Sequence, residues 1–120
     1  MSQQESLVIH PHEYIIHAEV QCAELDEDIN REMRERILET AMANRTLPVV
    51  LDLSKVAFLP SLSIGALVAL LAELKKSDQR LVLVGLQPPV RDVLAITRLD
   101  RIFDIHDTVV EAIAQIRPAS

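Results

Sequence analysis

Two short apolar runs with a helical segment between them constrain the fold of this chain most strongly. The runs are residues 48–53 (PVVLDL) and 81–84 (LVLV), and neither alternates apolar with polar residues. That pattern is expected of strands that are covered on both faces of a sheet. Residues 61–77 repeat apolar side chains at helical spacing. A strand, a helix and a strand of this combined length predict a right-handed βαβ unit, so the two strands should run parallel.

The segment before this unit predicts a hairpin and a long helix. Residues 7–10 and 14–20 are strand candidates, and Pro11 between them fits a turn or a sheet edge because it cannot donate to a ladder. In residues 26–44, apolar side chains recur four apart and acidic residues gather in the first turn. This favours an amphipathic helix whose dipole is complemented at its start.

The segment after the unit repeats the alternation in shorter form. Residues 88–97 predict a helix that starts at two prolines, residues 102–105 a short strand, and residues 109–116 a last amphipathic helix. Thr108 and Glu111 have the spacing of a capping box, which indicates where the last helix begins.

Together these elements predict a single α/β domain over residues 1–120, with an ordered core at about 7–117. The expected order is β-β-α-β-α-β-α-β-α, in a mixed sheet with parallel core strands and with amphipathic helices on one or both faces. Hydrophobic residues make up 49% of the chain, which is ample for one core and argues against a disordered regulator.

Charge and composition also limit the partners. The net charge of −6 argues against nucleic acid as the main ligand. The only aromatic residues are Tyr14, Phe58 and Phe103, which leave no platform for stacking bases. The longest apolar stretch, residues 64–72, is roughly half of what spans a bilayer, and the N-terminus lacks the features of a secretory signal. We therefore expect a cytoplasmic protein with no membrane partner.

No catalytic or cofactor motif is evident. Gly65 and Gly85 are the only glycines and lie twenty residues apart, so no loop can cradle a phosphate. The single cysteine, Cys22, cannot form an internal disulfide or a thiolate metal cluster. Ser61 and Ser63 do not lie in a G-x-S-x-G elbow. We expect no catalytic residue, no cofactor and no enzyme, although a fold alone does not exclude an activity.

The histidines offer only a weak metal candidate. His10 and His12 lie two apart, but Pro11 between them is expected to interrupt the strand, and His17 has the opposite parity to His12. Exposed histidines are therefore the expectation, rather than a zinc site with its ordinary ligand number. His106 is expected to be a pH-sensitive surface residue.

The stretch LDLSKVAFLPSLSIGAL, residues 51–67, joins a buried strand to the start of a helix. Ser61 is predicted to cap that helix, its Oγ accepting from the amide of Ser63 or Ile64, a contact worth about 1 kcal/mol. A phosphate on Ser61 would also face the positive end of the helix dipole. It would add roughly −1.5 to −2 charges, enough to abolish a docking patch without unfolding the domain.

At this stretch the sequence resembles the STAS domains, the family of anti-sigma factor antagonists (anti-anti-sigma factors). In that family a strand with an L-D-L-like run leads through a phenylalanine-containing turn to Asp-Ser-Ser/Thr-Gly-Leu-Gly at a helix start. The matching residues here are Leu51-Asp52-Leu53 and Phe58-Leu59-Pro60-Ser61-Leu62-Ser63-Ile64-Gly65. The later run RLVLVGLQPPVRDVLAITRLDRIFDI is similar to the family through Gly85, Pro89, Val90, Leu94, Leu99, Asp100 and Phe103.

The resemblance implies a phosphorylation site and a partner-binding surface. Ser61 stands at the family's phosphorylated serine, with Ser63 as the second choice. Pro60 replaces the motif aspartate, Leu62 the next Ser/Thr and Ser63 the first glycine, whereas Gly65 is retained. An acidic run that helps to engage the partner kinase looks like Glu24-Leu25-Asp26. The implied partner-binding residues are Glu24, Asp26, Pro60, Ser61, Leu62, Ser63 and Ile64.

Two functions follow from the resemblance. In the first, the chain binds an anti-sigma factor that is also a serine-protein kinase and frees the sigma factor, until phosphorylation of Ser61 ends binding and a PP2C-type phosphatase restores it. In the second, the chain is a constitutive, non-phosphorylated STAS scaffold in a signalling assembly, as the loss of the motif aspartate suggests. A monomer or weak dimer is expected.

Overall fold

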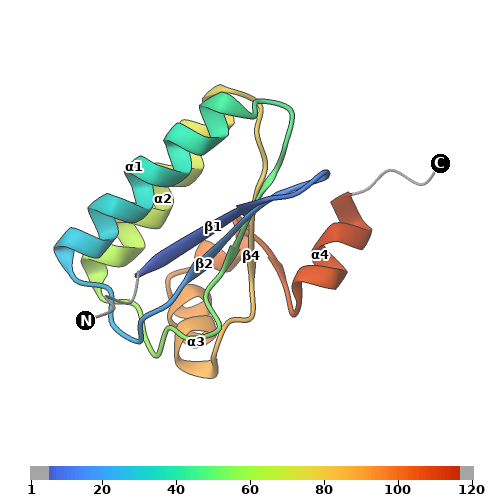
Figure 1. The fold of residues 1–120 in the computed structure, drawn as a ribbon. Helices are drawn as coiled ribbons and strands as arrows, with labels where there is room; N and C mark the ends of the chain where they lie inside the picture. Colours follow the sequence, from blue (N-terminus) through green and yellow to red (C-terminus); the bar gives the residue numbers. More distant parts are fainter. Residues whose placement is uncertain (1–5, 117–120) are drawn as a thin grey trace.

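The computed structural model describes residues 6–116 as one five-stranded sheet with helices on both faces (Figure 1). The strand order is β1-β2-β3-β4-β5, with β1 and β2 antiparallel and the remaining neighbours parallel. The predicted α/β class and mixed sheet are confirmed. The elements are β1 (Leu7–Pro11), β2 (Ile16–Val20), α1 (Glu27–Ala43), β3 (Val49–Asp52), α2 (Ser61–Lys76), β4 (Leu81–Val84), α3 (Pro88–Ile96), the 3₁₀ turn η1 (Leu99–Arg101), β5 (Asp104–His106) and α4 (Val109–Ile116).

The larger core lies between the sheet and helices α1, α2 and α3. Met33 and Ile37 of α1 and Leu67 of α2 are fully buried in it. These residues belong to the apolar stripes that predict both helices, and α1 and α2 lie side by side along the sheet (Figure 1). The apolar helix α2 is therefore mainly a core element.

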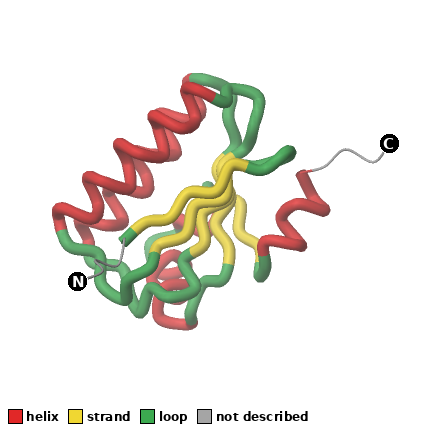
Figure 2. Tube along the Cα trace, in the orientation of Figure 1, coloured by secondary structure: helices red, strands yellow, loops and turns green. Residues whose placement is uncertain are grey.

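The second core lies on the opposite face, where α4 packs mainly against β3, β4 and β5. Ala112 of α4 is buried there with Val50, Val82 and Val84. Because β3 and β4 are covered on both faces, their sequences show no polar alternation. Figure 2 shows the helices on either side of the sheet, with α4 displaced from the β1–β2 hairpin. On the sheet face that α4 covers, the β1–β2 hairpin is therefore partly exposed.

Two strand predictions need correction. The fifth strand is Asp104–His106 rather than residues 102–105, because Arg98 adopts a left-handed conformation (φ 62°) and η1 follows it. This turn buries Phe103 in the core before β5 begins. The second strand begins at Ile16 rather than at residue 14. Within residues 6–116, no helix combines the length and apolar content needed to cross a bilayer.

Candidate functional site

Ser61 is exposed and does not cap α2, which corrects the predicted role. The N-cap residue is Pro60, whose carbonyl accepts from the amides of Ser63 and Ile64 at 2.9 and 3.0 Å. Because the proline ring holds Pro60 at φ −64°, this residue takes the extended cap conformation and Ser61 becomes the first helical residue. The Ser61 hydroxyl makes no hydrogen bond with any residue between 6 and 116.

Ser63 is fully buried and has a structural role. Its Oγ donates to the carbonyl oxygen of Leu25 at 3.3 Å, which joins α2 to the loop before α1. A hydroxyl in this position is closed to a modifying enzyme, so the geometry favours Ser61 over Ser63 as an acceptor. Ser63 stands where the family motif has a glycine. Its side chain therefore fills space that would be empty if this residue were a glycine.

A groove of about 410 Å³ runs between the N-terminal halves of α1 and α2. Its rim includes Ser61 and Leu62, and Leu62 is 71% exposed. A Cβ atom built on Gly65 meets nothing within 4 Å, so this glycine leaves the groove open rather than satisfying a close contact. The groove is lined by Glu27, Asn30, Arg31, Arg34, Ser61, Leu62, Gly65 and Ala66.

Asn30 is the functional candidate that sequence reasoning missed. It is only 6% exposed, and neither its side-chain nitrogen nor its side-chain oxygen has a hydrogen-bond partner among the described residues. Such an unsatisfied group costs about 1–3 kcal/mol. Asn30 falls on the same helical stripe as the buried Met33 and Ile37, and a polar residue on that stripe is the signal that could have identified it.

The two acidic candidates at the start of α1 differ in their roles. Asp26 is the N-cap, and its carboxylate accepts from the amide of Ile29 at 2.8 Å. Glu24 is exposed and precedes the buried Leu25. Asp26 therefore fixes the start of α1, whereas the side chain of Glu24 is accessible to a binding partner. Arg34 on the groove adds a cation that forms no ion pair within the described part of the chain.

Cys22 lies half-buried near this end of the molecule. Burial raises the pKa of its thiol, and the charges of Asp26 and Glu32 raise it further. The thiol is therefore protonated near neutral pH and is a weak nucleophile.

A polar cluster on the β1–β2 hairpin overturns one premise about the histidines, that His12 and His17 lie on opposite faces. Pro11 is the last residue of β1, an edge strand where proline is tolerated, so His12 lies outside the strand as expected. The register pairs His10 with His17, and the amide of His12 donates to the carbonyl of Ile15 at 2.9 Å. The chain reverses between the strands, so His12 and His17 share a face despite their opposite parity. The rings of these three histidines lie 5.9–6.4 Å apart between centroids.

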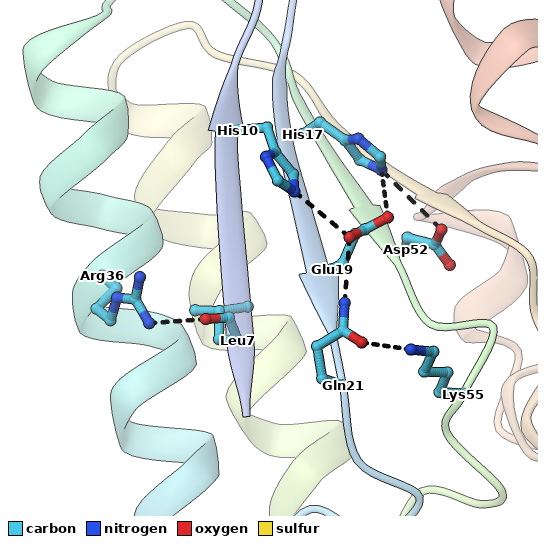
Figure 3. Close-up of polar contacts among 8 residues, drawn as sticks. All are labelled: Leu7, His10, His17, Glu19, Gln21, Arg36, Asp52 and Lys55. Atoms are coloured by element: carbon cyan, nitrogen blue, oxygen red, sulfur yellow. Dashed lines mark hydrogen bonds and ion pairs between the residues drawn. The ribbon is translucent and has the colours of Figure 1, made fainter. Parts of the chain in front are cut away.

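Two carboxylates complete this cluster (Figure 3). His17 Nε2 lies 3.7 Å from Glu19 Oε1 and 4.0 Å from Asp52 Oδ2. Burial lowers the pKa of His17, although both carboxylates act in the opposite direction. His106, by contrast, is half-buried on β5 with its Nε2 3.2 Å from Asp104 Oδ1.

Similar structures share this fold. A crystal structure of an anti-sigma factor antagonist from Thermotoga maritima has a TM-score of 0.80 at 25% identity, covering 93% of this chain and 95% of the other. The anti-sigma factor antagonist SpoIIAA in its unphosphorylated form has a TM-score of 0.76 at 21% identity, covering 95% and 98%. A phosphorylated form of the Bacillus protein SpoIIAA is similar too, with a TM-score of 0.69 at 20% identity, covering 92% and 99%.

Sequence comparison agrees with the fold. A Thermotoga maritima protein named as an anti-sigma factor antagonist is 38% identical over 69 residues, which cover 58% of this chain. The match spans 61% of that relative's length. The family model described as the STAS domain matches residues 4–112, nearly the whole chain. The chain therefore belongs to the STAS domain family.

Proposed function

We propose that this chain is an anti-sigma factor antagonist that docks through the N-terminal end of α2 and the adjoining groove. The observation that carries the proposal is the exposed Ser61, whose hydroxyl has no structural role and which stands at the rim of the groove. The likeness to relatives named as anti-sigma factor antagonists supports the same function.

The docking surface combines an apolar contact with unsatisfied polar groups. Leu62 projects from the rim and supplies apolar area that a partner can cover. Asn30 lines the groove with a buried amide that has no hydrogen-bond partner among residues 6–116. Because these amide atoms are buried, a partner would reach them only by displacing side chains that line the groove; a hydrogen bond to Asn30 would then remove the penalty of the unsatisfied amide and favour a specific occupant.

Phosphorylation of Ser61 would switch this surface off while leaving the fold intact. The amides of Ser61 and Leu62 have no backbone acceptor among residues 6–116, and they lie at the positive end of the α2 dipole. A phosphate is therefore tolerated there. The added charge of roughly −1.5 to −2 beside Leu62 would have to be desolvated on docking, which opposes binding.

The partner in this scheme is an anti-sigma factor that is also a serine kinase, and a PP2C-type phosphatase reverses the modification. The chain acts by binding and serves as a substrate.

A paired capture from the source cell tests the proposal, with wild-type protein, Ser61→Asp and Thr46→Asp as baits. Thr46 is exposed in the turn after α1, so its substitution adds the same charge at the other end of that helix. We expect a kinase-like anti-sigma protein to bind the wild type and Thr46→Asp and to be lost with Ser61→Asp. Mass spectrometry of the wild-type chain should locate a phosphate on Ser61.

The second candidate is the constitutive scaffold. The observation that favours it is Pro60, which caps α2 where the family motif has an aspartate. Identical partner sets for all three baits, with no phosphate on Ser61, would select this function and contradict the switch.

A further inference from the structure

The open face of the β1–β2 hairpin holds a donor set for a metal ion. Glu19 pairs with Asp52 across β2 and β3, and His10 pairs with His17 across β1 and β2. Residues two apart on a strand share a face, so His17 and Glu19 point the same way from β2. Figure 3 shows His10, His17, Glu19 and Asp52 converging from the three strands.

The distances suit one ion. The nitrogen of His17 and one oxygen each of Glu19 and Asp52 lie within 4.8 Å of one another. Ligands about 2.0–2.2 Å from a tetrahedral zinc ion lie roughly 3.4 Å apart. The His17 contacts of 3.7 and 4.0 Å therefore need only small side-chain movements to reach this spacing. His10 Nε2 lies 3.5 Å from the second oxygen of Glu19 and outside this group of three, so its side chain would have to turn toward the ion to add a fourth ligand.

The side chains around His17 form a donor set that a cation can bind. His17 Nε2 is buried and has no hydrogen-bond partner among the described residues. This nitrogen lies 3.7 Å from Glu19 Oε1 and 4.0 Å from Asp52 Oδ2, so two carboxylates are within reach of an ion bound to it. A neutral imidazole with carboxylates is a donor set that divalent transition ions accept. Without an ion, the same arrangement places an unsatisfied nitrogen beside two negative charges.

Neighbouring groups orient both carboxylates. Asp52 Oδ1 accepts from the amide of Ser54 at 2.8 Å, which leaves Oδ2 toward His17. Glu19 Oε2 accepts from Gln21 Nε2 at 3.1 Å, and Gln21 Oε1 accepts from Lys55 (Figure 3). Such outer contacts fix ligand direction in metal sites.

We propose that His17, Glu19 and Asp52, with His10 as the fourth ligand, bind one divalent first-row transition ion on this face. The ion would join the edge hairpin to β3. The site lies on the sheet face opposite α1 and α2, so it is independent of docking at Ser61.

Isothermal titration of the tag-free, chelator-treated full chain with Zn²⁺ tests the proposal. We expect one ion per chain with micromolar affinity or tighter, and a rise of about 5 °C or more in the thermal midpoint at saturation. His17→Gln, Glu19→Gln and Asp52→Asn should each weaken binding about tenfold or more. The matched control is His106→Gln, which removes a histidine beside a single carboxylate and should bind as wild type does.

A second measurement on the wild type does not depend on the variants folding. Histidine side-chain ¹⁵N spectra should show the Nε2 signal of His17 shifting with one equivalent of Zn²⁺, while the His106 signals stay in place. Absence of binding at 100-fold excess of Zn²⁺ over protein would overturn the proposal. So would unchanged affinity in folded Glu19→Gln and Asp52→Asn, because histidines alone would then account for any binding.

Discussion

The buried hydroxyl of Ser63 donates to the carbonyl of Leu25 at 3.3 Å and joins the start of α2 to the loop that enters α1. Asp26, the next residue along that loop, caps α1. This hydrogen bond thus links the starts of the two helices. The groove that carries Ser61 lies between these starts, so its shape depends on Ser63.

Ser63→Ala should lower the free energy of unfolding by about 1 kcal/mol, because the Leu25 carbonyl loses its donor. Ser61→Ala is the matched control and should change it by less than about 0.5 kcal/mol, since Ser61 is exposed and makes no such bond. Urea unfolding followed by circular dichroism measures both. Equal stability of the two variants would show that the Ser63 contact contributes nothing.

Asn30→Leu should raise the free energy of unfolding by about 1 kcal/mol, because an apolar side chain of similar size removes an unsatisfied buried amide. The same change should weaken capture of the anti-sigma partner. Chemical denaturation and the capture assay measure the two effects. A destabilised Asn30→Leu protein would indicate that the amide is satisfied in solution and would contradict this account of the groove.

Gly85→Ala and Gly65→Ala should act in opposite directions. Gly85 has φ +73°, and an added Cβ would lie 3.0 Å from Ser54 Cβ, so its substitution should cost at least about 1 kcal/mol. Gly65 lies within α2 with open space around it, so alanine there should stabilise by about 0.5–1 kcal/mol. Thermal unfolding of both variants measures these two stability changes. A Gly85→Ala protein that is more stable than the wild type would contradict the predicted backbone strain at Gly85.

In chelator, stability should fall as the pH drops below about 6.5, the ordinary pKa of histidine. Burial lowers the pKa of folded His17, so between its folded and unfolded pKa values the unfolded chain binds more protons. The contribution of neutral His17 to the free energy of unfolding is complete above the pKa of His17 in the unfolded chain. It is lost as the pH falls toward the lower pKa of His17 in the folded protein. The groups facing His17 are His10, His12, Glu19 and Asp52.

Thermal midpoints of wild type and His17→Gln between pH 7.5 and about 5 test this dependence. The substitution should flatten the curve in that range, because glutamine does not titrate. An equally steep decline in both proteins would assign the effect to other groups.

Local patterns predict several elements closely. The fourth strand has the expected bounds, Leu81–Val84, and α1 lies within one residue at each end of the predicted 26–44. Thr108 caps α4 as the capping-box spacing indicates, with its Oγ1 accepting from the amide of Glu111 at 3.1 Å. These features depend on residues a few positions apart, whose spacing is visible in the chain itself.

The errors concern contacts between distant segments. Parity along one continuous strand would place His12 and His17 on opposite faces, but the hairpin register places them on the same face because the chain reverses between the strands. The serine that was expected to cap α2 is exposed, and the buried serine bonds to a carbonyl 38 residues away. The burial of Asn30 depends on how α2 packs against α1. The residue pattern within α1 gives no information about that packing.

The elements, their order and the parallel core could be predicted from the sequence, because strand and helix periods are local properties set by side-chain geometry. Among residues 6–116, the folded arrangement of distant segments was needed to identify the serine hydroxyl and the asparagine amide that have no hydrogen-bond partner, and the histidine that faces Glu19 and Asp52. Each of these depends on the register and approach of segments far apart in the chain, and a one-residue shift in register would turn His17 to the other face of the sheet.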